Sequence, residues 1–209
     1  MSATGAINLG ANTIGLSASN NINITNNVDI SQATLNTGTN LSVGANSISV
    51  SAGNSISVGG AVFIDPAPVT GNTTFGNDSI SIATSNGANH NISIGNTSGH
   101  SVYIDQSHIS ATGLNTFGSD SINLNAGGSI SLAGSANIDQ TYNVAQGVSA
   151  VGISVGNDSI NLIALSGNIN AQSIGINQAN LSATGSIALG NDSITANAFG
   201  TLSATNITI

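Results

Sequence analysis

The sequence predicts an all-β protein, a parallel β-solenoid (β-helix) in which a single domain spans residues 1–209. Three observations lead to this prediction. The composition favours strands and turns over helices, one five-residue element returns along the whole chain, and short alternating segments fill the intervals between its copies.

The composition is far from that of an average globular protein. Charged residues make up 4% of the chain, against about a quarter in a typical domain. All of them are Asp, because the chain contains no Lys, Arg or Glu, so the long side chains that favour a solvated helix are scarce. Hydrophobic residues are 39% of the chain. There is enough apolar surface to bury, and we do not expect disorder.

The charge balance also excludes several partners. Binding to nucleic acid or to anionic lipid requires Lys and Arg, which are absent. No segment approaches the roughly 18 apolar residues of a membrane helix, so we expect no nucleic acid and no membrane insertion. The first residues show no secretory signal, which implies a removed signal or another export route. A net charge of −8 leaves metal cations and uncharged carbohydrate as suitable partners.

One five-residue element, Gly-Asn-Asp-Ser-Ile at 76–80, dominates the repetition. Closely similar or weaker copies stand at 10–14, 44–48, 118–122, 156–160 and 190–194. The isoleucines that end the copies are 32 to 42 residues apart and lie between polar neighbours. We expect five of them to point inward and form one buried column, namely Ile48, Ile80, Ile122, Ile160 and Ile194.

A second element lies between these copies. It reads Val-Phe-Ile-Asp at 62–65 and has counterparts at 28–30, 102–105 and 136–139. It places Asp65, Asp105 and Asp139 in one register. Further short segments alternate apolar and polar residues as half-buried strands do, at 55–58, 91–94, 129–132 and 167–170. Gly and Asn between the strands are expected to supply the positive φ of tight turns.

Short strands and a long repeat indicate a coil in which each turn hydrogen-bonds to the next. With two rungs of about 16–21 residues in each repeat, the chain would form roughly ten rungs and a rod of about 50 Å. An immunoglobulin-like sandwich also has short strands, but it gives no reason for the self-similarity.

Runs such as Ala-Gly-Gly-Ser-Ile-Ser-Leu at 126–132 and Ser-Ala-Gly-Asn-Ser-Ile-Ser-Val at 51–58 resemble the degenerate repeats of filamentous-haemagglutinin-type adhesins. The resemblance is compositional and covers most of the chain. It implies a right-handed parallel β-helix and a setting outside the cell. The chain is shorter than those adhesins, lacks their basic residues and shows no recognisable secretion domain at its N-terminus.

Four aspartates of the main element are candidate metal ligands: Asp78, Asp120, Asp158 and Asp192. Their element is similar to the second half of the Gly-Gly-x-Gly-x-Asp motif of calcium β-rolls. In such rolls the motif returns every nine residues, so that successive turns bind one ion, whereas these copies are 34 to 42 residues apart. We interpret the aspartates as turn residues whose carboxylates accept backbone hydrogen bonds. A Ca²⁺ site is the alternative.

The sequence predicts neither an enzyme nor a cofactor, and no catalytic residue. Polysaccharide-cleaving β-helices generally need a cation beside their carboxylates, and this chain has none. The histidines His90, His100 and His108 lack a metal-ligand spacing and are expected to face solvent. The aromatic residues, with Phe75 and Phe117 at matching positions, are expected in the core or in stacks. Asn-x-Ser/Thr triplets arise by chance in such a chain, for example at Asn23, Asn40, Asn91 and Asn180.

Three functions remain open. The first is a structural, self-assembling extracellular filament subunit, because residues 1–10 and 202–209 carry similar elements that would pair head to tail with other copies of the chain. The second is a segment of a cell-surface adhesin or passenger domain that attaches to carbohydrate or to a cell surface. The third is an ice-binding solenoid, which the mixture of Ser and Asn and the variable repeat length disfavour. We expect an extracellular or cell-surface location.

Overall fold

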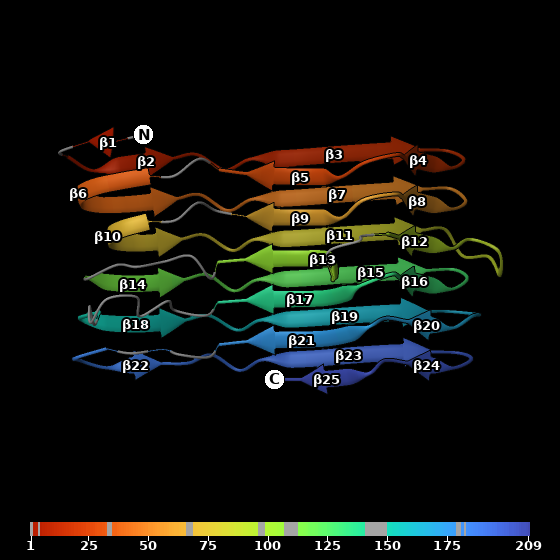
Figure 1. Ribbon diagram of the computed structural model, residues 1–209. Coiled ribbons are helices and arrows are strands. Elements are labelled where there is room, and N and C mark those ends of the chain that lie inside the picture. The colour runs from red at the N-terminus through yellow and green to blue at the C-terminus, as the bar shows by residue number, and fades with distance from the viewer. Residues whose placement is uncertain are drawn as a thin grey trace.

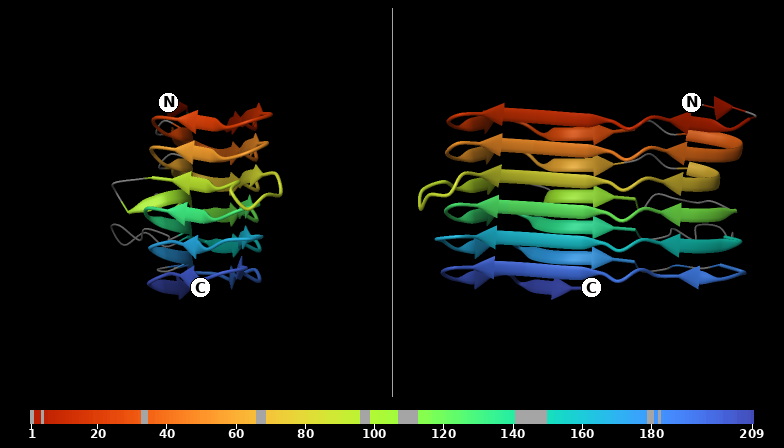
Figure 2. Two further views of the ribbon diagram at one scale, coloured as in Figure 1. Left: turned by 90° about the vertical axis from the view of Figure 1, so that its right-hand side faces the viewer. Right: turned by 180° about the vertical axis from the view of Figure 1, so that it is seen from behind.

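The computed structural model is a parallel β-solenoid, as the sequence predicts (Figure 1). It describes residues 2–3, 5–32, 35–65, 69–95, 99–106, 113–140, 150–178, 181 and 183–209. Strands are the only regular secondary structure in these ranges. The described residues therefore contain no helix that could cross a membrane. Each coil contributes strands to four parallel sheets, here named A to D, and successive coils stack along one axis (Figure 2).

Sheet A lies at the left of Figure 1 and the other three sheets at the right, and short connections such as residues 44–46 lead from sheet A to sheet B. It contains β1 (Ser2–Ala3), β2 (Ile7–Leu9), β6 (Leu35–Val43), β10 (Val69–Phe75), β14 (Leu114–Phe117), β18 (Gly152–Val155) and β22 (Ile187–Ala188). Both β1 and β2 pair with the long strand β6, so they belong to the same coil.

Sheets B, C and D follow sheet A in each coil. Sheet B contains β3 (Thr13–Ala18), β7 (Ser47–Ala52), β11 (Ser79–Thr84), β15 (Ser121–Ala126), β19 (Ser159–Ala164) and β23 (Ser193–Ala198). Sheet C contains β4 (Ile22–Ile24), β8 (Ile56–Val58), β12 (Ile92–Ile94), β16 (Ile130–Leu132), β20 (Ile169–Asn170) and β24 (Leu202–Ser203). Sheet D contains β5 (Val28–Ser31), β9 (Val62–Asp65), β13 (His100–Asp105), β17 (Ser135–Asp139), β21 (Ser173–Asn177) and β25 (Asn206–Thr208). We number the coils 1 to 6, so coil 1 ends with β5 and coil 6 consists of β22 to β25.

The register of the sheets follows the sequence repeats. Every copy of the Gly-Asn-Asp-Ser-Ile element leads into a strand of sheet B, and its isoleucine pairs with the isoleucine of the next coil from Ile14 to Ile194. The second element forms sheet D, in which Ile64 pairs with Ile104. Four of the five isoleucines predicted to be inward are buried, whereas Ile194 in the last coil is only partly buried. No following coil covers it.

The predicted count of roughly ten rungs is wrong. Each repeat of 32 to 42 residues forms one wide coil with four strands, whereas the repeat pattern predicts two narrow rungs. The described chain makes about five turns. Six strands at about 4.8 Å spacing make a stack about 24 Å deep, half of the expected length. The wider coil arises because it encloses two apolar cores side by side.

The larger core lies between sheets B, C and D, and the smaller core lines sheet A. Columns of Ile, Val and Leu fill the larger core, with Ile80, Ile92 and Ile104 as its contributions from coil 3. The smaller core holds Phe75 and Phe117, whose ring centroids are 5.9 Å apart, as their matching positions predict. Two separate cores require polar groups to be placed where the connections pass between them.

Glycine serves a different purpose in the turns than we expected. Among the described glycines only Gly99 has a positive φ, of 98°. At Gly53 and Gly59 the backbone of the preceding coil lies so close that an added Cβ would meet a carbonyl oxygen at 1.9 Å or 2.2 Å. These turns need glycine because the stacked coils leave no room for a side chain.

Candidate functional site: a buried ladder of carboxyl and amide groups

The four aspartates of the main element lie between the two cores, where the chain passes from sheet A to sheet B. With their counterparts in the first two coils they form what we call the Asx column: Asn12, Asn46, Asp78, Asp120, Asp158 and Asp192. Asp78, Asp120 and Asp158 are each only 1% exposed. Carboxyl groups are rarely so deeply buried unless they are paired.

Each side chain of the Asx column after Asn12 accepts a hydrogen bond from the backbone of the coil before it. The backbone N–H of Asp78 donates to Oδ1 of Asp120 at 2.8 Å, and that of Asp120 donates to Oδ1 of Asp158 at 2.8 Å. Asp158 N–H donates to Oδ1 of Asp192 at 3.0 Å. The predicted backbone hydrogen bonds are therefore present, but their donors are 34 to 42 residues away and not in the local turn. The column holds neighbouring coils together.

A second column, of glutamines, faces the aspartates from the ends of the sheet D strands. Nε2 of Gln106 donates to Oδ2 of Asp78 at 3.2 Å, and Nε2 of Gln140 donates to Oδ2 of Asp120 at 3.1 Å. Nε2 of Gln178 donates to Oδ2 of Asp158 at 3.3 Å. The Asx and glutamine columns thus form a polar ladder that separates the two cores.

The glutamines are also joined to one another. Gln140 donates to Oε1 of Gln106 at 3.3 Å, and Gln178 donates to Oε1 of Gln140 at 3.4 Å. In the first coil the equivalent residue is Gln32, whose buried Nε2 and Oε1 have no hydrogen-bond partner. The next coil has Pro66 at the equivalent sequence position, outside the described residues. The sequence signal for this column was Ile-Asp-Gln at 104–106 and 138–140, where strand alternation turns the glutamine inward after an outward aspartate.

Burial shifts the ionisation of the aspartates toward the neutral acid. Burial raises the pKa of Asp78 to about 6, against the lowering effect of its hydrogen bonds from Asn46 and Gln106. Burial likewise raises the pKa of Asp158 to about 6, with a further increase from the Asp192 charge. The pKa of Asp120 is raised well above its usual value by burial first and then by the charges of Asp78 and Asp158. No cation of the chain offsets this repulsion, so protonation of Asp120 relieves it.

The other candidate residues do not join the ladder. Asp105 and Asp139 are paired in register on the outer face of sheet D, and Asp65 stands beside Ser31 on the same sheet. The rings of Phe63 and Tyr103 stack on this face, 4.8 Å apart and 2° from parallel. Burial first, and then the charges of Asp65, Asp105 and Asp29, raise the pKa of Tyr103 to about 12. A small cavity of about 20 Å³ adjoins this face.

The histidines lie apart from the ladder. His90 follows β11 and its Nδ1 lies 2.9 Å from Oγ of Ser85, while the ring of His100 is tilted against that of Tyr103 at 5.4 Å. His108 is outside the described residues. Across the described ranges, no group of three or more His or Asp side chains is arranged to hold a metal ion.

We predict that calcium leaves the stability of the protein unchanged. Asp78, Asp120 and Asp158 already direct their oxygens to backbone and glutamine donors, so they do not present a shared set of oxygen ligands. Thermal unfolding with EDTA and with millimolar Ca²⁺ should give the same midpoint. A rise of more than about 10 °C with Ca²⁺ would reveal an ion site and contradict the prediction.

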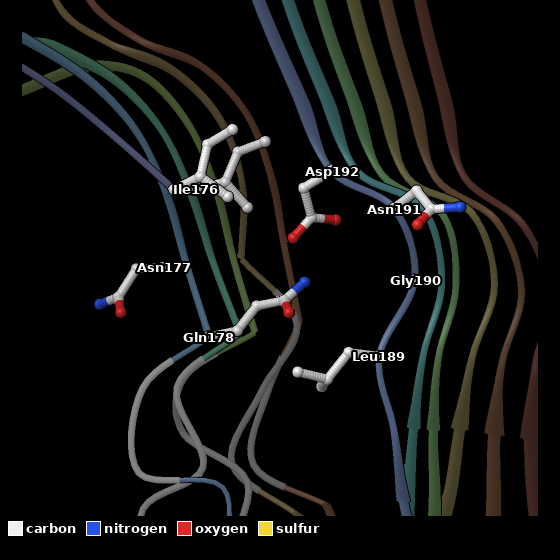
Figure 3. Close-up of a pocket in the computed structure, with 8 residues that line it drawn as sticks. Ile176, Asn177, Gln178, Leu189, Gly190, Asn191 and Asp192 are labelled. Atoms are coloured by element: carbon white, nitrogen blue, oxygen red, sulfur yellow. The ribbon is translucent and has the colours of Figure 1, made fainter.

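The ladder is open at the last coil. A cavity of about 580 Å³ lies there, lined by Ile176, Asn177, Gln178, Leu189, Gly190, Asn191, Asp192 and Ile209. Figure 3 shows the side chains of Gln178, Leu189 and Asp192 pointing toward one another across this cavity. In every earlier coil the corresponding space is filled by the next coil. We call this region the terminal cavity.

In comparisons with known proteins, no protein family, curated protein or solved structure matches the chain.

Proposed function

We propose that the protein is a structural, self-assembling subunit of an extracellular filament, and that copies join head to tail through the ends of the solenoid. The observation that carries the proposal is the apolar surface of coil 6. Its inward residues are 39% to 72% exposed because no coil follows them: Ile187, Leu189, Leu202, Ile207 and Ile209. Their counterparts inside the stack are buried.

Coil 1 presents a matching surface. Following the register through the sheets, Ile7 occupies the column of Ile187, Ile22 the column of Leu202, and Val28 the column of Ile207. A second copy placed after coil 6 would therefore set apolar side chains on apolar side chains in each of these columns. It would also pair the open strand edges, which otherwise expose unpaired backbone groups.

The polar ladder has a matching partner as well. Within the stack, the residue of the Asx column in each coil receives the backbone N–H of the preceding coil, and the first member of the column is Asn12. Asn12 of a second copy would take the place below Asp192 and accept its backbone N–H. This contact joins two different surfaces, coil 6 of one copy and coil 1 of the next, and is therefore heterologous. Such a contact extends into a fibre and does not close into a dimer.

The absence of Lys and Arg fits an exposed fibre, because it leaves no site for trypsin-like proteases. This point supports the extracellular location in the proposal, and the end-to-end contact does not depend on it.

We predict concentration-dependent filaments of the intact 209-residue chain, seen by electron microscopy and light scattering. Leu189→Lys and Ile207→Lys place a charge in the apolar contact and should give folded particles that stay short or monomeric. Phe199→Lys is the matched control. Phe199 is 81% exposed between β23 and β24, outside the inward columns, so this variant should assemble like the unchanged protein.

A protein that stays monomeric at high micromolar concentration would contradict the filament. The adhesin segment would then be the better proposal, with coil 6 continuing into further coils of a longer polypeptide. The outer face of sheet D favours that second function, since the Phe63–Tyr103 stack and the nearby aspartates are not needed for the core. Loss of attachment to cells or carbohydrate in a Tyr103→Ser variant would support it.

A further inference from the structure

The Asx column ends at Asp192, which is the only aspartate of the column without a coil on both sides. Asp78, Asp120 and Asp158, each covered by a following coil, are 1% exposed, whereas Asp192 is partly exposed at the terminal cavity. Its carboxylate already accepts the backbone N–H of Asp158 at 3.0 Å. The geometry of Asp192 is thus that of the interior aspartates except for the missing coil.

We propose that head-to-tail assembly is controlled by pH, because the contact buries the carboxyl group of Asp192 and takes up a proton there. The inference rests on the proposed filament and specifies how its junction is regulated. A buried carboxylate with no cation nearby is costly, whereas the neutral acid is tolerated. Acidic conditions should therefore favour the joined state and alkaline conditions the separate subunits.

The described residues around the junction include no Lys or Arg, because the chain contains neither. Asp192 faces Gln178 and Leu189 across the terminal cavity, and it lies next to Asp158 of the coil before it (Figure 3). The incoming first coil contributes Asn12 to this column and apolar residues to the others. The titratable neighbour of Asp192 among the described residues is the Asp158 carboxyl group, whose charge makes an ionised Asp192 less favourable at the junction.

The interior of the solenoid gives an independent precedent. Asp158 occupies the place that Asp192 would take at a junction, between an Asx residue of the coil before and one of the coil after. Burial and the Asp192 charge raise the pKa of Asp158 to about 6. Asn46 shows that the column also accepts an amide, because its backbone N–H and Nδ2 both donate to Oδ1 of Asp78. Asparagine at position 192 is therefore compatible with the column and cannot ionise.

The experiment compares the concentration needed for assembly at pH 5 and pH 8. We expect the intact chain to assemble at a concentration at least about tenfold lower at pH 5, which corresponds to the uptake of one proton over one pH unit. Asp192→Asn should assemble at pH 8 nearly as well as at pH 5. Asp105→Asn is the control: it removes one charge from the outer face of sheet D in coil 3, away from both ends of the stack, and should keep the full pH dependence.

The outcomes separate the two proposals. If neither the intact chain nor Asp192→Asn assembles at any pH, the filament itself is wrong and the pH control with it. If the intact chain assembles equally at both values, or if Asp192→Asn keeps the same pH dependence, filaments form but Asp192 does not control them. Added salt gives a further check: 0.5 M NaCl screens general repulsion between acidic subunits, and it should not replace acidification.

Discussion

Replacing Asp120 by asparagine is expected to raise the stability of the protein at neutral pH. Asp120 lies between Asp78 and Asp158, and these three carboxyl groups share a buried column without a cation. An amide at this position removes the repulsion and can donate a hydrogen bond to Oδ1 of Asp158, as Asn46 does to Asp78. Gln140, whose Nε2 now donates to Oδ2 of Asp120, would turn its amide so that Oε1 accepts from the new Nδ2. The unfolding midpoint at pH 7.5 should rise by several degrees in Asp120→Asn.

The same variant should lose part of the pH dependence of stability, because Asp120, whose pKa is raised by burial, can no longer take up a proton, whereas Asp78 and Asp158 remain. Asp78 and Asp158 have folded-state pKa values of about 6, above the usual 3.8. The folded protein therefore binds more protons than the unfolded chain between about pH 4 and pH 6. Their contribution is fully present below about pH 4 and is lost as the pH rises through about 6. A shift of this size corresponds to on the order of 3 kcal/mol for each group.

Thermal unfolding at pH 4.5 and pH 7.5 measures this effect. The unchanged protein should be more stable at pH 4.5, in contrast to proteins whose carboxylates form ion pairs. Asp120→Asn should reduce the difference between the unfolding midpoints at pH 4.5 and pH 7.5. Asp29→Asn, which alters an exposed aspartate, should leave this difference nearly unchanged. If the unsubstituted protein and both variants show the same pH dependence of stability, the Asx column does not bind additional protons in the folded state.

Ile122→Asn is expected to cause a large loss of stability. Ile122 is fully buried and lies in the isoleucine column between Ile80 and Ile160. Asparagine there would remove apolar contacts and leave an unpaired amide in the larger core, at a cost of about 2–4 kcal/mol. For a chain of this size the unfolding midpoint should fall by roughly 5–15 °C.

Ile194→Asn is the matched control for that substitution. It places the same residue in the same column, but at the last coil, where Ile194 is only partly buried. The new amide can reach solvent there, so we expect less than half of the loss seen for Ile122→Asn. Similar losses at both positions would mean that the last coil is as well covered as the interior.

The sequence predicted the columns of this fold well because its repeats carry the register directly. Isoleucines at matching places in each copy fixed the pairing of sheet B from Ile14 to Ile194, and strand alternation set which side chains face inward. The number of strands in each coil could not be predicted from the sequence, because the segments that form sheet A are rich in Thr, Asn and Gly. Leu35–Val43 and Val69–Phe75 form strands through pairing with neighbouring coils and not through an alternating pattern of their own.

The candidate site could be predicted only in part. The recurring aspartates were visible, and so was their role as acceptors of backbone hydrogen bonds. Their partners were not, because each donor belongs to a different coil and lies 32 to 42 residues away. The glutamine column was hidden for a similar reason: Gln106 and Gln140 follow exposed aspartates, and only the enclosing coil turns them toward Asp78 and Asp120.

The in-register stacking has an evolutionary consequence. A deletion of residues 120–157, one whole repeat, would bring Ile160 beneath Ile80 and would join Asp158 to the column at the place that Asp120 leaves. Unequal recombination between repeats can therefore lengthen or shorten the protein by entire coils without changing its cross-section. A gain or loss of a single residue within a strand would instead turn that strand's apolar side chains outward. The fold therefore tolerates changes of length in steps of one repeat, whereas the spacing within each strand has to stay constant.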